Sequence, residues 1–311
     1  MGAVRGKTPR QRSSPMAHKR SIAWTATFGR IVWMAIAAGG VWADPAGAVT
    51  VVRLDARDNG RLVVSVGLNG KGAYRFLVDT GATTTVLSQK LAERLGVASR
   101  GTARVHTFAG EVPVPVARLD TVGIGSRWVV VVDVLCADLG RMFGLEPAIE
   151  GILGQDVLSR FNYLLDRRGR RLEIEEDGDL GAALSGTPVP FNSRGGKIYV
   201  QTAGGDLRLM LDSGIRYPVL YEDVVSKVEL AQAGAGETTA AESGIGCRTL
   251  RPARLAALAI GDARIRNLQV YLTKRTEVGR PEDGFLPVRL FDAVYVNNAK
   301  AFLILNPHRA H

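Results

Sequence analysis

A twelve-residue pattern occurs twice in this chain of 311 residues, and its spacing constrains the fold more than any other feature. Residues 76–87 read Phe-Leu-Val-Asp-Thr-Gly-Ala-Thr-Thr-Thr-Val-Leu, and residues 209–220 read Leu-Met-Leu-Asp-Ser-Gly-Ile-Arg-Tyr-Pro-Val-Leu. Three apolar residues, an Asp, a hydroxyl residue and a Gly align at an offset of 133, and Val-Leu closes both copies. Repetition at a fixed offset marks a repeated structural unit. The chain is therefore expected to contain two similar halves.

The repetition continues downstream of both copies. Residues 151–154 read Gly-Ile-Leu-Gly and residues 284–287 read Gly-Phe-Leu-Pro, again at an offset of 133. Between these motifs, Ala-Arg-Leu at 117 and 253 and Ile-Gly at 124 and 260 match at an offset of 136. A three-residue gap accounts for the difference. Coincidence does not produce such a series, so we interpret the chain as a duplication.

Within each half the pattern is that of short β-strands. Runs of β-branched or alternating apolar residues separated by Gly, Asn and Pro are typical of strands, and Asn69-Gly70 indicates a hairpin. A helix is expected at 88–95, where Ser88 can cap it, and a counterpart at 221–228. The strands expected in the first half are 51–54, 62–68, 74–78, 112–117, 128–134 and 172–175.

These elements predict an all-β fold of two similar lobes related by a pseudo-two-fold, with a cleft between them. The lobes are expected at residues 49–180 and 187–308, joined by a linker at 181–186 within a stretch rich in Gly, Asp, Ser and Pro. Residues 231–246 are almost all Ala, Gly, Thr, Ser and Glu, which predicts a mobile loop inserted in the second lobe.

The N-terminal part has the composition of an export signal. Residues 1–30 carry seven basic residues and no acidic one, and the apolar run 31–43 leads to Ala46-Gly47-Ala48. This run of 13 residues is shorter than the ~20 needed to span a bilayer. We expect residues 1–48 to be a signal peptide, with translation from Met16 or an uncleaved membrane anchor as alternatives. The expected location is periplasmic or extracellular.

Charge and residue counts exclude several functions. The formal net charge is +10, but residues 1–48 hold seven basic residues and one acid, so the rest carries about +4. A basic face for nucleic acid is therefore not expected. Four histidines are too few for a His-rich metal site, and we expect no metal or cofactor. His106 is interpreted as a strand or flap residue, Phe143 and Leu145 as core or pocket wall, and Cys136 and Cys247 as unpaired, with a disulfide as the alternative.

Two Asp residues at equivalent positions of a repeat suit one kind of chemistry. A single Asp-[Ser/Thr]-Gly is explained by a β-turn, but here each copy follows an apolar run and has a Gly-containing motif downstream. Amide hydrolysis without a metal or covalent nucleophile requires a base for the water and an acid for the departing amine. Two carboxylates about 3 Å apart share one proton and supply both. Asp79 and Asp212 are the candidate pair.

The same residues resemble a known family. Residues 76–87 with residues 151–154 look like the retroviral-type aspartic peptidases, particularly their bacterial relatives, and the doubled arrangement resembles the pepsin-like architecture. The resemblance covers about residues 50–308. It implies an aspartic endopeptidase in which each lobe supplies one Asp. The implied partner is a peptide or protein substrate, and the chain would be a monomer with an internal pseudo-dimer.

The resemblance also gives roles to the surrounding residues. Thr80 and Ser213 would cross-brace the two loops, and Gly81 and Gly214 would let backbone amides reach the carboxylates. A flap would span residues 105–114. The remaining supporting positions are Ala82 after the first Gly, Gly154 beneath the first catalytic turn, and Thr107, Phe108, Ala109 and Gly110 at the flap tip.

Two positions in the second half depart from the pattern. Ile215 stands where the first half has Ala82, and Pro287 stands where it has Gly154. A bulky Ile crowds the loop, and Pro removes a backbone donor. Two alternatives to an active bilobal peptidase therefore stay open. One is a catalytically inactive, peptide-binding relative with the same fold, and the other is a first lobe that is active only as a homodimer.

Overall fold

The computed structural model describes residues 49–56, 60–107, 110–176, 180–194, 196–232, 239–243, 246–275 and 280–309. Every described residue belongs to one compact unit, Ala43–His311. The expected export segment, residues 1–48, lies outside the described residues. Within the ranges described, no helix is long and apolar enough to cross a membrane.

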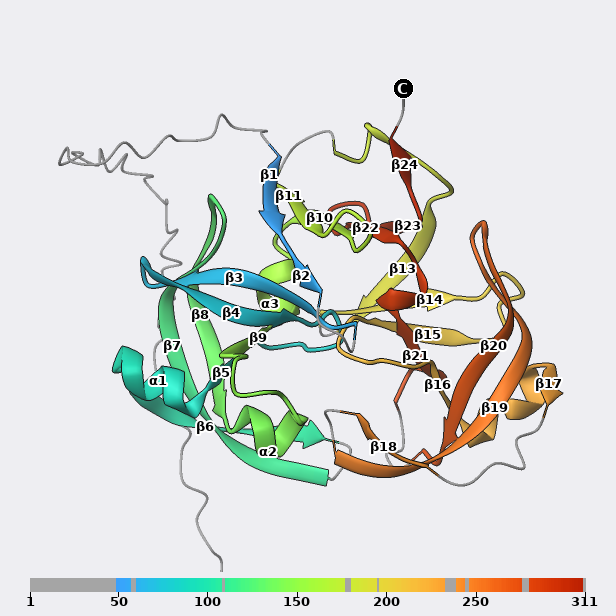
Figure 1. The fold of residues 1–311 in the computed structure, drawn as a ribbon, viewed down its shortest axis with the longest axis horizontal. Helices are drawn as coiled ribbons and strands as arrows, with labels where there is room; N and C mark the ends of the chain where they lie inside the picture. Colours follow the sequence, from blue (N-terminus) through green and yellow to red (C-terminus); the bar gives the residue numbers. More distant parts are fainter. Residues whose placement is uncertain are drawn as a thin grey trace, which may run out of the picture. The chain divides into compact units, whose positions relative to one another are not determined.

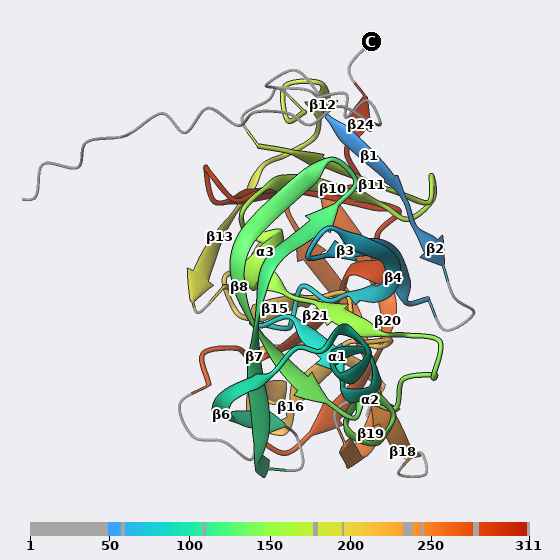
Figure 2. The same cartoon turned by 90° about the vertical axis from the view of Figure 1, so that its left-hand side faces the viewer.

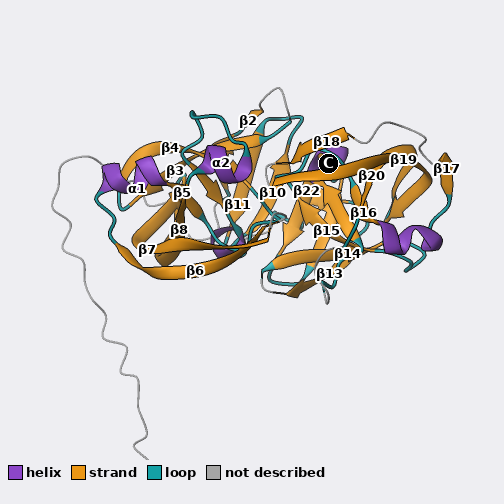
Figure 3. Cartoon of the chain, turned by 90° about the horizontal axis from the view of Figure 1, so that it is seen from below, coloured by secondary structure: helices purple, strands orange, loops and turns teal. Residues whose placement is uncertain are grey.

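The fold is all-β, as predicted, and Figure 3 shows how few helical turns interrupt the strands. The elements of the first half lie in chain order from blue to green in Figure 1. They are β1 (Thr50–Arg53), β2 (Asp55–Ala56), β3 (Leu62–Leu68), β4 (Lys71–Val78), β5 (Val86–Ser88), α1 (Gln89–Leu95), β6 (Ser99–Thr107), β7 (Gly110–Ile124), β8 (Arg127–Ala137), α2 (Leu139–Phe143), β9 (Gly151–Leu153), α3 (Gln155–Leu158), β10 (Asn162–Asp166) and β11 (Arg171–Glu175).

The second half repeats much of this succession. Its elements are β12 (Leu184–Ser185), β13 (Val189–Arg194), β14 (Lys197–Gln201), β15 (Arg208–Asp212), β16 (Val219–Tyr221), the 3-10 helix η1 (Glu222–Lys227), β17 (Leu230–Gln232), β18 (Thr239–Ser243), β19 (Gly246–Ile260), β20 (Ala263–Thr273), β21 (Gly284–Pro287), the 3-10 helix η2 (Val288–Leu290), β22 (Ala293–Asn297), β23 (Phe302–Leu305) and β24 (His308–Arg309).

The strand order confirms the duplication. The first sheet runs β2-β3-β4-β9-β5-β8-β7-β6, and the second half of the large sheet runs β13-β14-β15-β21-β16-β20-β19-β17. Parallel pairing joins Phe76 to Gly151 in the first half and Leu209 to Gly284 in the second, at the offset of 133. The long hairpin β7–β8, prominent in Figure 2, pairs at an offset of 136 from the hairpin β19–β20. β8 and β20 even share one burial pattern along 11 residues.

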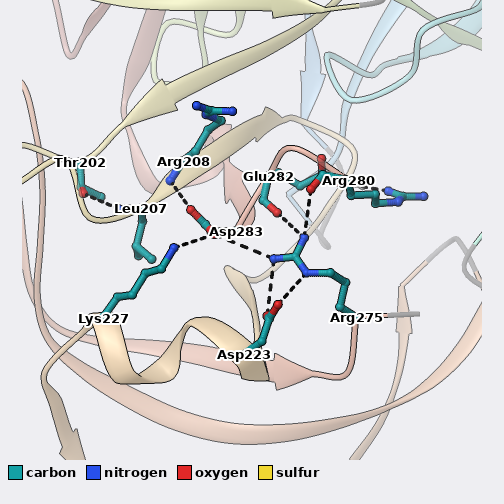
Figure 4. Close-up of polar contacts among 9 residues, drawn as sticks. All are labelled: Thr202, Leu207, Arg208, Asp223, Lys227, Arg275, Arg280, Glu282 and Asp283. Carbon is teal, nitrogen blue, oxygen red and sulfur yellow. Dashed lines mark hydrogen bonds and ion pairs between the residues drawn. The ribbon is translucent and has the colours of Figure 1, made fainter. Parts of the chain in front are cut away.

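A polar motif is repeated together with the strands. The Arg75 backbone amide donates to the Glu150 carboxylate at 3.0 Å, and the Arg208 amide donates to Asp283 at 2.8 Å. A cationic side chain on a helix forms an ion pair with each acid. Arg94 of α1 pairs with Glu150, and Lys227 of η1 pairs with Asp283 (Figure 4). All three pairs of equivalent residues lie 133 apart, so the duplication extends to side-chain contacts.

The expected helix at 88–95 is confirmed, whereas its counterpart in the second half differs. α1 has Ser88 as its N-cap, and the Ser88 hydroxyl accepts a hydrogen bond from the Leu91 amide. At the equivalent position Tyr221 gives no side-chain cap, and residues 222–227 form a 3-10 helix. Without the capping bond, and with Val224 and Val225 β-branched, the α-helical form loses its local support.

The two halves join through a central strand pair. β10 pairs antiparallel with β22, so that Tyr163 faces Val296, and β1, β11 and β23 extend the same sheet. The segment expected as a linker, 181–186, contains β12, which pairs with β24 near the C-terminus. Leu184 is buried there in a small apolar cluster with Tyr295. The lobe boundaries 49–180 and 187–308 stay a prediction.

Residues expected to form an inserted loop contain strands. Within 231–246, β17 ends at Gln232, and β18 pairs with β19 so that Ser243 faces Gly246. In the first half Thr107 faces Gly110 in the same way, 136 residues earlier. The expected loop is therefore partly the second-half copy of the β6–β7 hairpin. Residues 233–238 and 244–245 lie outside the described residues.

The close approach of β21 to β16 gives a test of the core. A Cβ at Gly284 would lie 3.0 Å from Leu220 Cα and closer still to the Val219 carbonyl oxygen. Since backbone atoms cannot move aside, Gly284→Ala should reduce the free energy of unfolding by about 1–3 kcal/mol. Gly140→Ala, at an exposed helical position with ordinary contacts, is the control and should be neutral or slightly stabilising. Equal melting temperatures for the two variants would contradict this packing.

Candidate active site

Asp79 and Asp212 reach the same place from equivalent strands. Asp79 directly follows β4, and its backbone amide donates to the Leu153 carbonyl of β9 at 3.0 Å. Asp212 is the last residue of β15 and pairs with Pro287 of β21. The two carboxyl groups lie close together, because the Asp212 carboxylate approaches Gly81 of the first loop and the Asp79 carboxylate approaches Gly214 of the second. The structure brings together the two residues that the repeat singled out.

Thr80 and Ser213 tie the two loops together. The Thr80 hydroxyl donates to the Leu211 carbonyl at 3.0 Å and accepts from the Ser213 amide at 3.0 Å. In return, the Ser213 hydroxyl donates to the Val78 carbonyl at 2.7 Å and accepts from the Thr80 amide at 3.0 Å. Both side chains are buried. Four hydrogen bonds between groups shielded from solvent thus fix one Asp loop against the other, as the resemblance implied.

Glycine at positions 81 and 214 makes room for the opposite carboxylate. A Cβ on Gly81 would lie 2.5 Å from Asp212 Oδ2, and a Cβ on Gly214 would lie 2.7 Å from Asp79 Oδ2. Each Gly also donates its backbone amide to the Asp of its own loop, at 2.9 Å for Gly81 and 2.7 Å for Gly214. A side chain at either position would separate the two carboxylates.

Burial governs the protonation of the pair. Burial raises the pKa of Asp79, although backbone hydrogen bonds from Gly81 and Ala82 oppose the shift. Burial and then the charge of Asp79 raise the pKa of Asp212 well above its usual range, against the backbone bonds from Gly214 and Ile215. Two nearby carboxylates in such a site share a proton, and the apparent pKa values belong to the pair.

The Ile215 amide keeps the electrostatic role of its counterpart. Ala82 donates its backbone amide to Asp79 at 3.2 Å, and the Ile215 amide likewise lowers the pKa of the Asp212 carboxyl group. The Ile215 side chain packs against an apolar cluster that includes Met210 and Phe285, and it lines the cleft. The larger side chain therefore changes the wall of the cleft and leaves the loop's polar contact in place.

The replacement of Gly154 by Pro287 is accompanied by a second change. In the first half the Gly154 amide donates to the Thr85 hydroxyl at 3.1 Å. In the second half Pro287 has no N–H, and Pro218 stands where Thr85 does, 133 residues on. Donor and acceptor are lost together, so no buried group is left unsatisfied by the exchange, and such paired replacements are nearly neutral.

Sequence reasoning missed one supporting residue, Gln155. This fully buried side chain donates from Nε2 to the Thr80 carbonyl at 3.1 Å, and so holds the first Asp loop from below. Its only sequence signal was its position directly after Gly154. The second half has Val288 there, so this contact exists in one lobe alone.

A cleft of about 170 Å³ opens above the pair. Its apolar walls include Phe143 and Leu145, in agreement with their interpretation as pocket wall, and Val105 of the expected flap also lines it. Thr107 and Gly110 close the β6–β7 hairpin, while Phe108 and Ala109 lie outside the described residues. Three cationic residues that sequence reasoning did not select complete the lining: Arg61, Lys197 and Arg280.

Of the two cysteines, the structure describes the side chain of Cys136. Cys136 is buried and makes no disulfide. The side chains of Cys247 and His106 lie outside those that the structure describes.

The reciprocal bonding predicts a stability effect at Thr80. Thr80→Val keeps the shape of the side chain but leaves the Leu211 carbonyl and the Ser213 amide without their partners. Each unsatisfied buried group costs about 1–3 kcal/mol, so the melting temperature should fall clearly. Thr102→Val, an exposed change of the same kind, is the control. Thr80→Val and Ser213→Ala should also be non-additive when combined, because they remove one network. Full additivity would argue against the brace.

The raised pKa values predict how stability depends on pH. In the folded state the pair holds a proton that the unfolded chain releases near the usual Asp value of 3.8. Its contribution to stability is therefore present below that pH and is lost as the pH rises through the raised pKa. Asp212→Asn removes the ionisation, so it should raise the melting temperature at pH 7 and have much less effect near pH 3.5. Asp120→Asn on the exposed side of β7 is the control. A lower melting temperature for Asp212→Asn at pH 7 would contradict the assignment.

Part of the chain is similar to known proteins. The family model described as aspartyl protease matches residues 64–157. Among solved structures, a retropepsin-like aspartic protease from Rickettsia conorii is similar at 19% identity and a TM-score of 0.30, over 41% of this chain and 89% of that one. Basic 7S globulin from soybean is similar at 11% identity and a TM-score of 0.48, over 84% of this chain and 95% of that one. No curated protein matches the sequence.

The two structural likenesses are too distant to carry an argument, and the fold rests on the strand pairing described above. The family match is more informative, because residues 64–157 contain Asp79, the first loop and the Gly154 turn beneath it. Residues 64–157 therefore match the aspartyl protease family, and the duplication repeats the Asp-containing motif of this segment in the second half.

Proposed function

We propose that this protein is an aspartic endopeptidase whose catalytic pair is Asp79 and Asp212. The observation that carries the proposal is the reciprocal bonding of Thr80 and Ser213, which holds two buried carboxyl groups against each other at the floor of one cleft. A buried like-charged pair is unfavourable for stability alone. Its retention in both halves of the duplication is therefore best explained by chemistry.

The chemistry follows from the protonation of the pair. With one proton shared by Asp79 and Asp212, the ionised carboxylate of the pair takes a proton from a water positioned between the two groups. The protonated partner donates to the carbonyl oxygen of the substrate as the water attacks the carbonyl carbon. The tetrahedral intermediate then collapses and the C–N bond breaks. The departing nitrogen receives the proton that the first carboxylate took up, and a hydroxyl proton of the intermediate returns to the other carboxylate as the carbonyl forms again. Both carboxyl groups return to their starting state.

The cleft is suited to an extended chain. Leu77, Val86 and Ile152 line it from the first half, and Met210 and Phe285 line it from the second. Side chains of an extended peptide alternate between opposite faces, so apolar walls from both halves can each receive some of them. The β6–β7 hairpin presents Val105 to the cleft, where main-chain bonds would bind the peptide as an added strand.

The location and assembly belong to the same proposal. The basic and apolar segments of residues 1–48 support export to the periplasm or the cell exterior, with membrane attachment where that segment stays uncleaved. Since both carboxylates come from one chain, a monomer is sufficient for activity. N-terminal sequencing of the native protein tests the export step, and an intact Met1 or Met16 would argue against cleavage.

Replacing either Asp should abolish turnover. Asp79→Asn and Asp212→Asn each remove the shared proton and the path for its transfer, so we expect losses of at least about 10³-fold in kcat for both. Because the two groups act as a unit, the double variant should be scarcely slower than either single one. The measurement is cleavage of a peptide library between pH 3 and 8, with Asp120→Asn as the control.

Other outcomes distinguish the alternatives. Activity in Asp212→Asn with none in Asp79→Asn would make the first lobe the active part, working as a homodimer. Its activity would then depend on the square of protein concentration. If the wild-type protein binds extended peptides but cleaves none at any pH, the protein is a peptide-binding relative of the same fold.

A further inference from the structure

The cleft carries more positive than negative charge. Its cationic lining residues are Arg61, Lys197 and Arg280, and among the described lining residues the only acids are Asp79 and Asp212. Since the two Asp residues share one proton, the lining has a net charge of about +2 when the cations are protonated. A charged cleft with apolar walls concentrates ligands of the opposite sign. This excess favours an anionic ligand, although Glu282 beside Arg280 and Glu146 near Arg61 offset part of it.

Two of the cations occupy equivalent positions of the duplication. In the first half Val63 pairs with Leu77, and in the second Tyr199 pairs with Met210. Leu77 and Met210 are repeat partners at the offset of 133, so Val63 corresponds to Tyr199. Arg61 and Lys197, each two residues earlier, therefore correspond to each other. The duplication places one cation beside the Asp pair from each half.

The three cations differ in the partners that they already have. Arg280 donates to Glu282 Oε1 at 3.1 Å, and Glu282 is only 2% exposed (Figure 4). The Arg61 guanidinium donates to the Gly144 carbonyl at 3.4 Å and lies near Glu146. Within the part of the chain that the structure describes, the Lys197 ammonium makes no hydrogen bond and no ion pair, although its charge acts on both Asp carboxylates. Lys197 is thus the cation most available to a ligand.

The position of Lys197 is fixed by the strand that carries it. It begins β14, which pairs with the catalytic strand β15, and its side chain is half-buried at the cleft wall. A half-buried ammonium has lost part of its hydration, and a carboxylate that reaches it restores that loss with a charge-assisted hydrogen bond.

We propose that the cleft selects acidic extended peptides, and that Lys197 binds the carboxylate of a Glu or Asp side chain close to the cleaved bond. Arg61, the counterpart of Lys197 in the duplication, offers an equivalent position for a second acidic side chain. This inference rests on the proposed peptidase function, because it names the substrate class of the same cleft.

The test compares peptides that differ in one carboxylate. Two fluorogenic peptide series carry Glu or Gln, which have the same shape, at each position within three residues of the cleaved bond. We expect at least one position where kcat/KM for Glu exceeds that for Gln by about tenfold, the worth of a charge-assisted hydrogen bond. The ratio should fall toward one at high salt and below about pH 4, where the substrate Glu becomes protonated.

Variants of Lys197 test whether this residue causes the preference for Glu over Gln. Lys197→Met should remove the Glu-over-Gln ratio at that position, Lys197→Arg should retain it, and Lys197→Glu should favour Lys over Gln there. Lys71→Met, an exposed change on the β3–β4 hairpin, is the matched control and should retain the ratio. Melting curves of each variant show whether it is folded, and the ratio between two substrates does not depend on the amount of active protein.

The outcomes separate this inference from the peptidase proposal. Cleavage with equal rates for Glu and Gln peptides at every position would overturn the acidic preference and leave the peptidase intact. A preference that survives Lys197→Met would overturn the role of Lys197. If no peptide is cleaved, fluorescence anisotropy with the same Glu and Gln peptides decides the matter. Tighter binding of the Glu peptide, lost in Lys197→Met, supports the inference even then, and equal binding overturns it.

Discussion

The reciprocal hydrogen bonds between Thr80 and Ser213 are the constraint on which the rest of this structure depends. Each hydroxyl donates to the strand that carries the opposite Asp and accepts from the opposite loop. Neither loop can therefore move without breaking bonds that no water replaces, because both side chains are buried. The close approach of the carboxyl groups, the need for glycine at 81 and 214, and the raised pKa values all follow from this one contact.

The two halves keep the contacts that position the pair and differ in those that support each loop separately. In the first half the Thr85 hydroxyl donates to Asp156 at 2.7 Å, and Gln155 reaches the Thr80 carbonyl. In the second half Pro218 and Arg289 stand at the positions of Thr85 and Asp156. Proline fixes the backbone without any partner. The second loop is thus supported differently, by the rigid proline and by a hydrogen bond from Arg289 to the Arg216 carbonyl at 3.4 Å, so loss of the first-half contacts is no sign that it has degenerated.

Much of this arrangement could be predicted from the sequence. A constant offset between two copies of a motif shows that the halves are similar, and it also predicts which residues occupy equivalent positions in the paired strands. The offsets of 133 and 136 recur in the pairing of Phe76 with Gly151 and of Leu209 with Gly284. The predictions that were wrong concerned elements whose form depends on individual contacts, which a sequence pattern does not show. The 3-10 form of residues 222–227 follows from a missing cap at Tyr221. The strand β18 lay in a segment whose small polar residues suggested only a loop.

The cations of the cleft were missed for a related reason. Arg61 and Lys197 lie 136 apart, whereas the Asp residues that they flank lie 133 apart, because the hairpin between β14 and β15 is three residues shorter than its counterpart. An alignment anchored on the Asp residues therefore places Val64 opposite Lys197, and the equivalence disappears. Only the strand pairing restores it. Since one half uses Arg and the other Lys, the duplicated site is symmetric in charge but not in hydrogen-bond geometry. A single chain allows this difference, while a homodimer of identical lobes does not, and the two sides of the cleft can thereby bind different side chains.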